Sequence, residues 1–239
     1  MLKDPSGRIA LAQLDAVEFL RTLESESVNL VLTDPPYESL EKHRKKGTTT
    51  RLKNSKASSN DWFEIFPNAR FSELFTEVYR VLKPNTHFYM FCDQETMFHA
   101  KPLGEAAGFT FWKPIIWDKM VMGMGYHYRA QYECILFFEK GKRKVNHLNI
   151  PDVLSFKRVW GGYPTEKPLG VVSTLIRMST QKGEIICDPF CGSGTTGIAA
   201  IKAGCDFIGN DKGEEAIQVS HRRIRAALQE QHLREEDHG

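Results

Sequence analysis

The chain has 239 residues, of which 41% are hydrophobic and 26% charged, fractions that are ordinary for a soluble protein. The formal net charge of +2 does not indicate a partner by itself. No apolar run is long enough to span a bilayer, and the first residues lack the pattern of a signal peptide. We therefore expect a cytoplasmic protein without a membrane partner, folded as one domain over residues 1–239.

The five cysteines of the chain have no Cys-x-x-Cys spacing and no matching pair of histidines. Most of them lie in apolar segments that resemble strands. This distribution predicts reduced, buried thiols rather than a disulfide framework. It also predicts no metal site.

In chain order, short apolar segments alternate with segments of helical period. Strands are predicted over residues 8–14, 28–33, 87–92, 109–117, 132–139, 184–187 and 207–209. Helices are predicted over residues 16–23, 71–82, 95–107, 167–179 and 214–231, and a further helix ends at Lys202. This alternation predicts an α/β fold with a doubly wound, mostly parallel sheet.

The strand over residues 28–33 ends at Asp34-Pro35-Pro36-Tyr37. The two prolines lack the N–H that a sheet or helix needs, so the chain must leave the strand in a stiff turn. In open α/β sheets the carboxyl ends of the strands bind ligands. A carboxylate, a proline carbonyl and a flat ring suit a planar group that bears an amine. The alternative is a rigid turn in which Asp34 only caps the backbone.

A second motif, Gly192-x-Gly194-x-x-Gly197, follows the strand over residues 184–187. The pattern is typical of dinucleotide sites, with Asp211 at the end of the next strand as the ribose ligand. The alternatives are another adenosine cofactor, or glycines that only permit tight packing. Asp188 would repel a pyrophosphate but suits the ammonium group of an amino acid, and adenosine joined to an amino acid is S-adenosylmethionine.

The two motifs resemble those of amino-group DNA methyltransferases. Asp34-Pro35-Pro36-Tyr37 resembles the catalytic motif, and the segment from Asp188 to Gly194 resembles the cofactor loop. Their order along the chain resembles the β class. The resemblance implies a circularly permuted, seven-stranded, Rossmann-like methyltransferase sheet, in which the first strand lies beside the strand over residues 207–209.

The resemblance also implies a set of cofactor residues. Residues 165–168 resemble the segment near the methionine end of the cofactor, and Asp15 matches the acid that contacts the adenine amine. Asp211 stands where the family more often has Glu. The residues expected to bind S-adenosyl-L-methionine are Asp15, Thr165, Lys167, Pro168, Asp188, Phe190, Cys191, Gly192, Ser193, Gly194, Thr195 and Asp211.

The expected chemistry is methyl transfer to the exocyclic amine of a base. If Asp34 and the Pro35 carbonyl accept the two N–H bonds of the amine, its lone pair points at the methyl group, and positioning supplies most of the catalysis. Asp34 also stabilises the positive charge that develops on the nitrogen. Tyr37 would stack on the base, which must be flipped out of the duplex. We therefore assign catalysis to Asp34, Pro35, Pro36 and Tyr37.

Basic residues suggest where DNA binds. Residues 38–60 predict a mobile basic loop that follows DNA phosphates, or else a solvated insertion. Residues 140–163 are the candidate target-recognition segment and are short for the family. Tyr126, Tyr128 and Tyr132 line the base pocket or belong to the core. The residues expected to bind DNA are Lys42, Lys45, Lys46, Arg51, Lys53, Lys142 and Arg143.

The predicted function is site-specific transfer of a methyl group to the N6 amine of adenine in double-stranded DNA. Methylation of cytosine N4 is the alternative within the family, because the same geometry serves either amine. An NAD-dependent oxidoreductase would explain the glycine loop but would leave Asp34 without a role. The resemblance leaves open a homodimer and a cognate restriction enzyme as partners.

Overall fold

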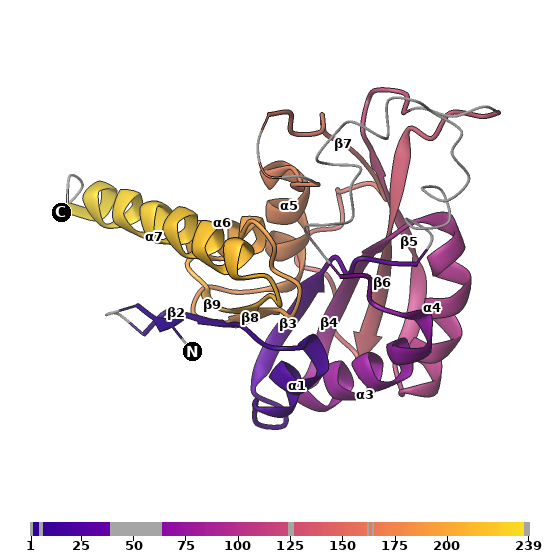
Figure 1. The fold of residues 1–239 in the computed structure, drawn as a ribbon, viewed down its shortest axis with the longest axis horizontal. Coiled ribbons are helices and arrows are strands. Elements are labelled where there is room, and N and C mark those ends of the chain that lie inside the picture. Colours follow the sequence, from indigo (N-terminus) through magenta and orange to yellow (C-terminus); the bar gives the residue numbers. More distant parts are fainter. Residues whose placement is uncertain are drawn as a thin grey trace.

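The computed structural model describes residues 2–4, 7–38, 64–123, 127–161, 163 and 165–236. In these residues one sheet runs through the molecule, in the strand order β1-β2-β9-β8-β3-β4-β6-β5-β7 (Figure 1). The strands are β1 (Leu2–Lys3), β2 (Ile9–Ala12), β3 (Val28–Thr33), β4 (Leu82–Cys92), β5 (Thr110–Asp118), β6 (Tyr132–Lys140), β7 (Val153–Ser155), β8 (Ile185–Asp188) and β9 (Asp206–Asn210).

The sheet is mostly parallel, as predicted. The strands from β2 to β4 in spatial order all run in the same direction, whereas β6 is antiparallel to both of its neighbours, β4 and β5. Each of the seven predicted strands is present. The short strands β1 and β7 extend the sheet at its two edges. They were not predicted, because segments of two or three residues are too short to show the alternating pattern of a strand.

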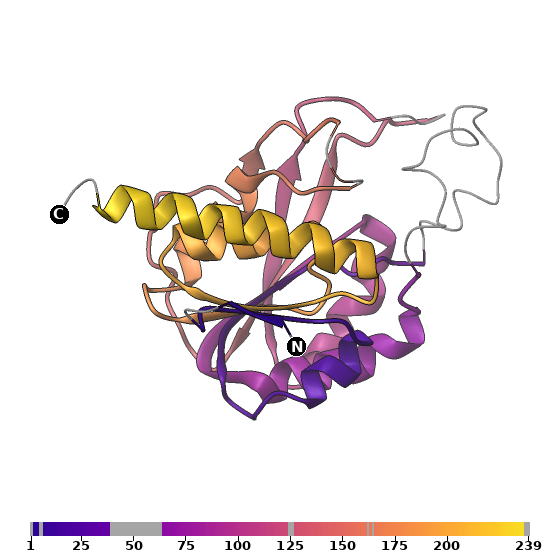
Figure 2. The same cartoon turned by 60° about the vertical axis from the view of Figure 1, so that its left-hand side comes forward.

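Helices cover both faces of the sheet, which confirms the doubly wound architecture. One face packs against α1 (Ala16–Arg21), α3 (Phe71–Val81) and α4 (Gln94–Ala106), and a 3-10 turn, η2 (Asn68–Arg70), precedes α3. The other face packs against α5 (Leu169–Ser179), α6 (Thr195–Lys202) and α7 (Glu214–Glu236) (Figure 2). Within the described ranges, no helix combines the length and apolar character that a bilayer span requires.

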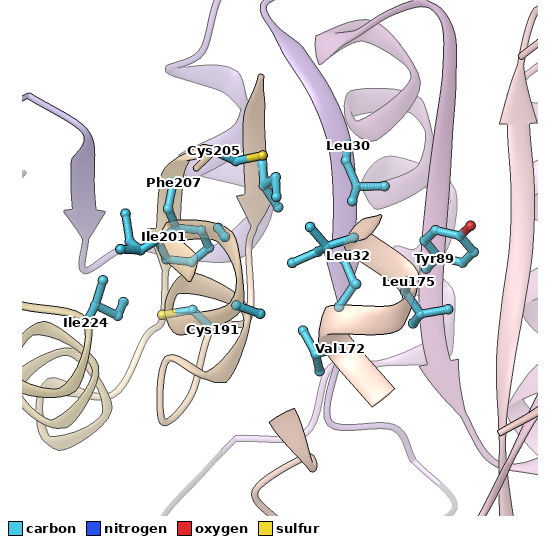
Figure 3. Close-up of a cluster of buried hydrophobic side chains, with 14 of the residues drawn as sticks. Leu30, Leu32, Tyr89, Val172, Leu175, Cys191, Ile201, Cys205, Phe207 and Ile224 are labelled. Carbon is cyan, nitrogen blue, oxygen red and sulfur yellow. The ribbon is translucent and has the colours of Figure 1, made fainter. Parts of the chain in front are cut away.

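Every residue of β3 is buried, which explains why four of its six residues are apolar. Leu30 and Leu32 point toward α5, where Val172 and Leu175 complete that side of the core (Figure 3). Parallel strands covered on both faces are expected to be apolar throughout. The first charged group along this segment is Asp34, which directly follows the carboxyl end of β3.

The permutation predicted from the motif order is visible in the pairing of β2 with β9. The two strands are parallel, with Ile9 opposite Phe207 and Ala12 opposite Asn210. Arg8 strengthens this junction because its Nε atom lies 3.2 Å from Oδ1 of Asp206. The beginning of the chain thus lies beside the strand that precedes α7.

Candidate active site

A cavity of about 1510 Å³ opens at the carboxyl ends of β3, β8 and β9. Between β3 and β8 the strand order reverses, and ligands of open α/β sheets bind at such a switch point. The cavity is lined by both sequence motifs. The predicted site residues that line it are Asp15, Asp34, Pro35, Pro36, Tyr37, Thr165, Lys167, Asp188, Phe190, Cys191, Gly192, Ser193, Thr195 and Asp211.

The Asp-Pro-Pro-Tyr segment forms the stiff exit from β3 that the prolines predict. The Pro36 carbonyl accepts the N–H of Phe66 at 2.7 Å, and Tyr37 forms an isolated bridge with Phe66. Among the described residues, no N–H is donated to the Pro35 carbonyl. Pro35 therefore keeps the acceptor that the proposed amine contact requires.

Asp34 belongs to a line of alternating charges. Nζ of Lys167 is hydrogen-bonded to Oδ2 of Asp34 and lies 3.5 Å from Oε2 of Glu133. Oε1 of Glu133 lies 2.8 Å from Nζ of Lys119. All four residues line the cavity. Burial works to lower the pKa of Lys167, but the two carboxylates outweigh it and raise that pKa, so Lys167 is a cation.

Asp188, at the end of β8, has a buried carboxylate with three internal donors. It accepts the hydroxyls of Thr33 and Thr196, each at 2.7 Å, and the N–H of Phe190 at 3.1 Å. Burial nevertheless dominates and raises the pKa of Asp188 to about 7. The carboxylate is thus held rigidly at the cavity wall, and a cation placed near it would favour its ionised form.

The glycine loop between β8 and α6 depends on backbone conformations that suit glycine. Gly194 precedes α6 with φ of +79°, and a Cβ there would lie 2.8 Å from Cβ of Ser220 on α7. Gly192 has φ of +48°, and a Cβ there would meet only the Tyr163 ring, at 3.9 Å. The loop thus packs tightly against α7 on one side and is open on the side of the cavity.

Asp211 follows β9, and its carboxylate accepts the N–H of Gly192 at 3.0 Å and that of Gly213 at 2.9 Å. Burial raises its pKa. The neighbouring Asn210 is fully buried, and its side chain bonds the backbone of Leu14 and Pro189. Asp211 thus bonds the backbone of the glycine loop at Gly192, whereas the Asn210 side chain ties the segment after β2 to Pro189.

Asp15 has more structural partners than the sequence suggested. It caps α1 by accepting the N–H groups of Val17 and Glu18. Arg70, from η2, also donates two hydrogen bonds to it, at 2.7 and 2.8 Å. The Arg70 hydrogen bond is the main reason why the pKa of Asp15 is lowered to about 2.

Thr165, Glu166 and Lys167 line the cavity just before α5, and Thr165 has a positive φ of 60°. Arg223 of α7 holds this segment in place. One of its NH groups bonds the Glu166 carboxylate and the other bonds the Ser193 carbonyl at 2.8 Å. Arg223 thereby connects the segment to the glycine loop. The cavity lining does not include Pro168 or Gly194, which set the backbone at the starts of α5 and α6.

Of the predicted DNA-binding residues, the structure describes Lys142 and Arg143, and neither lines the cavity. Lys42, Lys45, Lys46, Arg51 and Lys53 lie outside the described residues. Lys142 and Arg143 follow β6 at the sheet edge opposite Asp34, because Thr86, early in β4, pairs with Lys140. Arg143 is paired there with Glu184. Tyr128 is fully exposed and does not line the cavity.

Among the charged cavity residues that were not identified from the sequence are Glu133, Lys119 and Arg70, which pair with predicted site residues or with one another. Glu133 lies on β6, Lys119 directly follows β5, and Arg70 comes from η2. Glu133 offers the clearest signal, because it is the one charged residue in the apolar segment from Tyr132 to Phe138. Lys119 and Arg70 have no comparable sequence signal.

The doubly wound sheet, the glycine loop after β8 and the Asp-Pro-Pro-Tyr turn after the neighbouring β3 define a Rossmann-like α/β enzyme whose ligands meet at the switch point of the sheet. The family described as DNA methylase matches residues 28–222. The chain belongs to this DNA methylase family.

Individual relatives agree over nearly the whole chain. DNA adenine methyltransferase YhdJ of Escherichia coli (strain K12) is 28% identical over 257 residues, which cover 89% of this chain and 81% of that protein. The crystal structure of the M1.HpyAVI–SAM complex has a TM-score of 0.66 and 23% identity, covering 90% of this chain and 99% of the other. PvuII DNA methyltransferase (cytosine-N4-specific) has a TM-score of 0.68 and 17% identity, covering 95% and 94%.

Proposed function

We propose that this protein transfers a methyl group from S-adenosyl-L-methionine to the N6 amine of an adenine flipped out of duplex DNA. One observation supports this proposal above all others. The Asp34 turn after β3 and the glycine loop after β8 line the same cavity, so an amine acceptor and a cofactor loop face one space. An NAD-dependent oxidoreductase would need the loop but not the turn.

The residues of the loop fit S-adenosylmethionine better than a dinucleotide. Asp188 and Asp211 place two carboxylates beside the start of α6, where a pyrophosphate would be repelled. The same acids suit an ammonium group and ribose hydroxyls, respectively. The open space over Gly192 allows close approach of a ligand to the backbone. When bound, this cofactor supplies a methyl group on a positively charged sulfur.

The residues of the turn would orient the amine. Lys167 is bonded to Oδ2 of Asp34, which leaves Oδ1 as an acceptor for the amine. The Pro35 carbonyl is also available, because no described N–H is donated to it. Two acceptors for two N–H groups hold the nitrogen with its lone pair free for in-line attack, and well-held geometry contributes roughly 7–11 kcal/mol. The Asp34 carboxylate also stabilises positive charge on the nitrogen as it forms.

Adenine is favoured over cytosine on two grounds. Asp34 precedes the prolines, as is more frequent in the adenine group, and a relative that aligns with 89% of the chain is named a DNA adenine methyltransferase. The fold does not discriminate between the two bases, since a cytosine-N4-specific enzyme has a similar TM-score.

A surface beside the cavity suits DNA. Lys119, Arg158 and Val159 line the cavity, and neither residues 119–131 nor residues 156–161 contain an acid. Trp160 is 72% exposed, with the Arg158 guanidinium 4.3 Å from its ring centroid. Cations attract phosphates, and exposed rings can stack on bases. Contacts from the basic loop, a homodimer and a restriction partner stay predictions of the sequence.

The test is incubation with methyl-labelled S-adenosylmethionine and mixed-sequence duplex DNA, followed by hydrolysis to nucleosides and chromatography. We expect label in N6-methyl-deoxyadenosine. Label in N4-methyl-deoxycytidine would establish the cytosine alternative. Absence of label from DNA, together with binding of NAD, would refute the methyltransferase and support the oxidoreductase.

A further inference from the structure

We propose that Lys167 and Glu133 are positioning residues for Asp34: Lys167 fixes which carboxylate oxygen faces the substrate amine, and Glu133 holds Lys167 in place. The proposal rests on the proposed function, in which Asp34 accepts an N–H from that amine. It differs from the role that family resemblance implies for Lys167, which is contact with the cofactor.

The line of charges joins four separate parts of the fold. Asp34 follows β3, Lys167 precedes α5, Glu133 lies on β6 and Lys119 follows β5. The signs alternate along the line from Lys119 to Asp34. Each ion therefore has an opposite charge beside it, which offsets the cost of removing it from water. Without Glu133, the Lys167 ammonium would have Asp34 as its one carboxylate partner in this line.

Lys167 is well placed to orient a carboxylate. Its side chain is 12% exposed, and Nζ lies 5.2 Å from the centroid of the Phe91 ring. Because the stem is enclosed, the ammonium has little freedom to follow a rotating partner. It bonds Oδ2 of Asp34, and no described residue donates a hydrogen bond to Oδ1. The oxygen available to the amine is consequently determined by Lys167.

The ionisation of Asp34 depends on groups from every neighbouring element. They are Lys167, Glu133, Lys119, Asp188, Cys92 and Tyr37. Burial has the largest effect and raises the pKa of Asp34, and Glu133 acts in the same direction. Lys167 and Lys119 lower it. Removal of Lys167 and removal of Glu133 should therefore shift the titration of Asp34 in opposite directions.

Two variants test this directly. Lys167→Met retains an unbranched apolar side chain but removes the charge, and Glu133→Gln retains the shape of the side chain. Asp34 can be titrated by NMR in protein with ¹³C-labelled aspartate carboxyls, without cofactor or DNA, with Asp34→Asn identifying its resonance. Lys113→Met is the matched control, because Lys113 on β5 pairs with Asp152 at an exposed site.

In Lys167→Met we expect the Asp34 midpoint to rise by about one to three pH units, the usual effect of losing a cation at this range. In Glu133→Gln it should fall, and in Lys113→Met it should not move. The acid limb of the single-turnover rate of methyl transfer should shift in the same directions. At the pH optimum of each protein, the single-turnover rate of methyl transfer should be about a hundredfold lower in Lys167→Met than in wild type, as expected for a misplaced reactive group. The affinity of Lys167→Met for the cofactor should be retained.

An unchanged Asp34 midpoint in Lys167→Met would overturn the proposal. Loss of cofactor affinity with an unchanged midpoint would also overturn it, and would return Lys167 to the cofactor. A wild-type protein that transfers no methyl group to DNA would refute the proposed function instead. The NMR titration separates these failures because it does not require turnover.

Discussion

Asp188 gives the proposed cofactor site a defined pH dependence. Burial raises the pKa of this carboxyl to about 7, and the nearby Asp34 contributes in the same direction. Below pH 7 the free protein therefore holds Asp188 mostly protonated. An ammonium group bound beside it favours the carboxylate, so binding of S-adenosylmethionine should release a proton, and the affinity should fall as the pH falls.

The size of the effect follows from that pKa. The dissociation constant should vary as one plus the ratio of protonated to ionised Asp188, which is an increase of about eightfold from pH 6.5 to pH 5.5. At pH 6, about 0.9 proton should be released for each cofactor bound. This range lies below the pKa of an α-amino group, roughly 7.7–8.0, so the ligand stays an ammonium ion.

Isothermal titration calorimetry in two buffers with different ionisation enthalpies measures both quantities. Asp188→Asn should remove the pH dependence and the proton release. Asp211→Asn is the matched control, since it removes the other carboxylate that bonds the backbone at the cofactor loop but should leave proton release by Asp188 in place. A wild-type affinity that is constant between pH 5.5 and 6.5, without proton release, would refute contact between Asp188 and the ammonium group.

Three further predictions concern other parts of the site. Asp34→Ala should abolish methyl transfer with cofactor affinity nearly unchanged, and a single-turnover rate above a tenth of wild type would rule out Asp34 as the amine acceptor. Asp211→Ala should weaken cofactor binding by roughly ten- to a hundredfold, the value of a charge-assisted contact of about 1.5–3 kcal/mol; calorimetry that finds equal affinity would place the ribose elsewhere. Gly194→Ala should lower the free energy of unfolding in urea by about 1–2 kcal/mol for the left-handed backbone and by about 1–3 kcal/mol more for contact with Ser220. At Gly183, φ is +85° and a Cβ would meet nothing within 4 Å, so Gly183→Ala should lose only the free energy that is due to the left-handed backbone. Equal losses of unfolding free energy in the two variants would contradict the predicted clash.

The parts of the site that were predicted from the sequence are those that depend on local backbone chemistry. Pro35 and Pro36 end a strand whatever its place in the sheet. The glycines at 192–197 indicate the backbone conformations of their own loop. The rule that parallel strands present their carboxyl ends at one edge then places both motifs at the same cavity. This reasoning needs no knowledge of the distance between the two motifs along the chain.

The parts that were missed depend on how distant segments pair. Because β6 runs antiparallel between β4 and β5, its first residues reach the cavity and its last residues lie at the far edge. The same reversal brings Glu133 to Asp34 and takes Arg143 away from it. Arg70 illustrates a second difficulty, since its contact with Asp15 joins residues 55 positions apart. No local pattern in the chain reports such a contact.

The position of β3 also has a consequence for the timing of folding during synthesis. One of its two neighbours, β8, is made much later, and Thr33 and Asp188 are 155 positions apart. At roughly 5–20 residues per second, a ribosome needs about 8 to 31 s to cover that distance. During this interval the edge of β3 that later pairs with β8 is unpaired, the kind of surface that promotes aggregation. Slow translation between the two motifs, or a shortage of chaperones, should therefore reduce the yield of folded protein without any change in the finished active site.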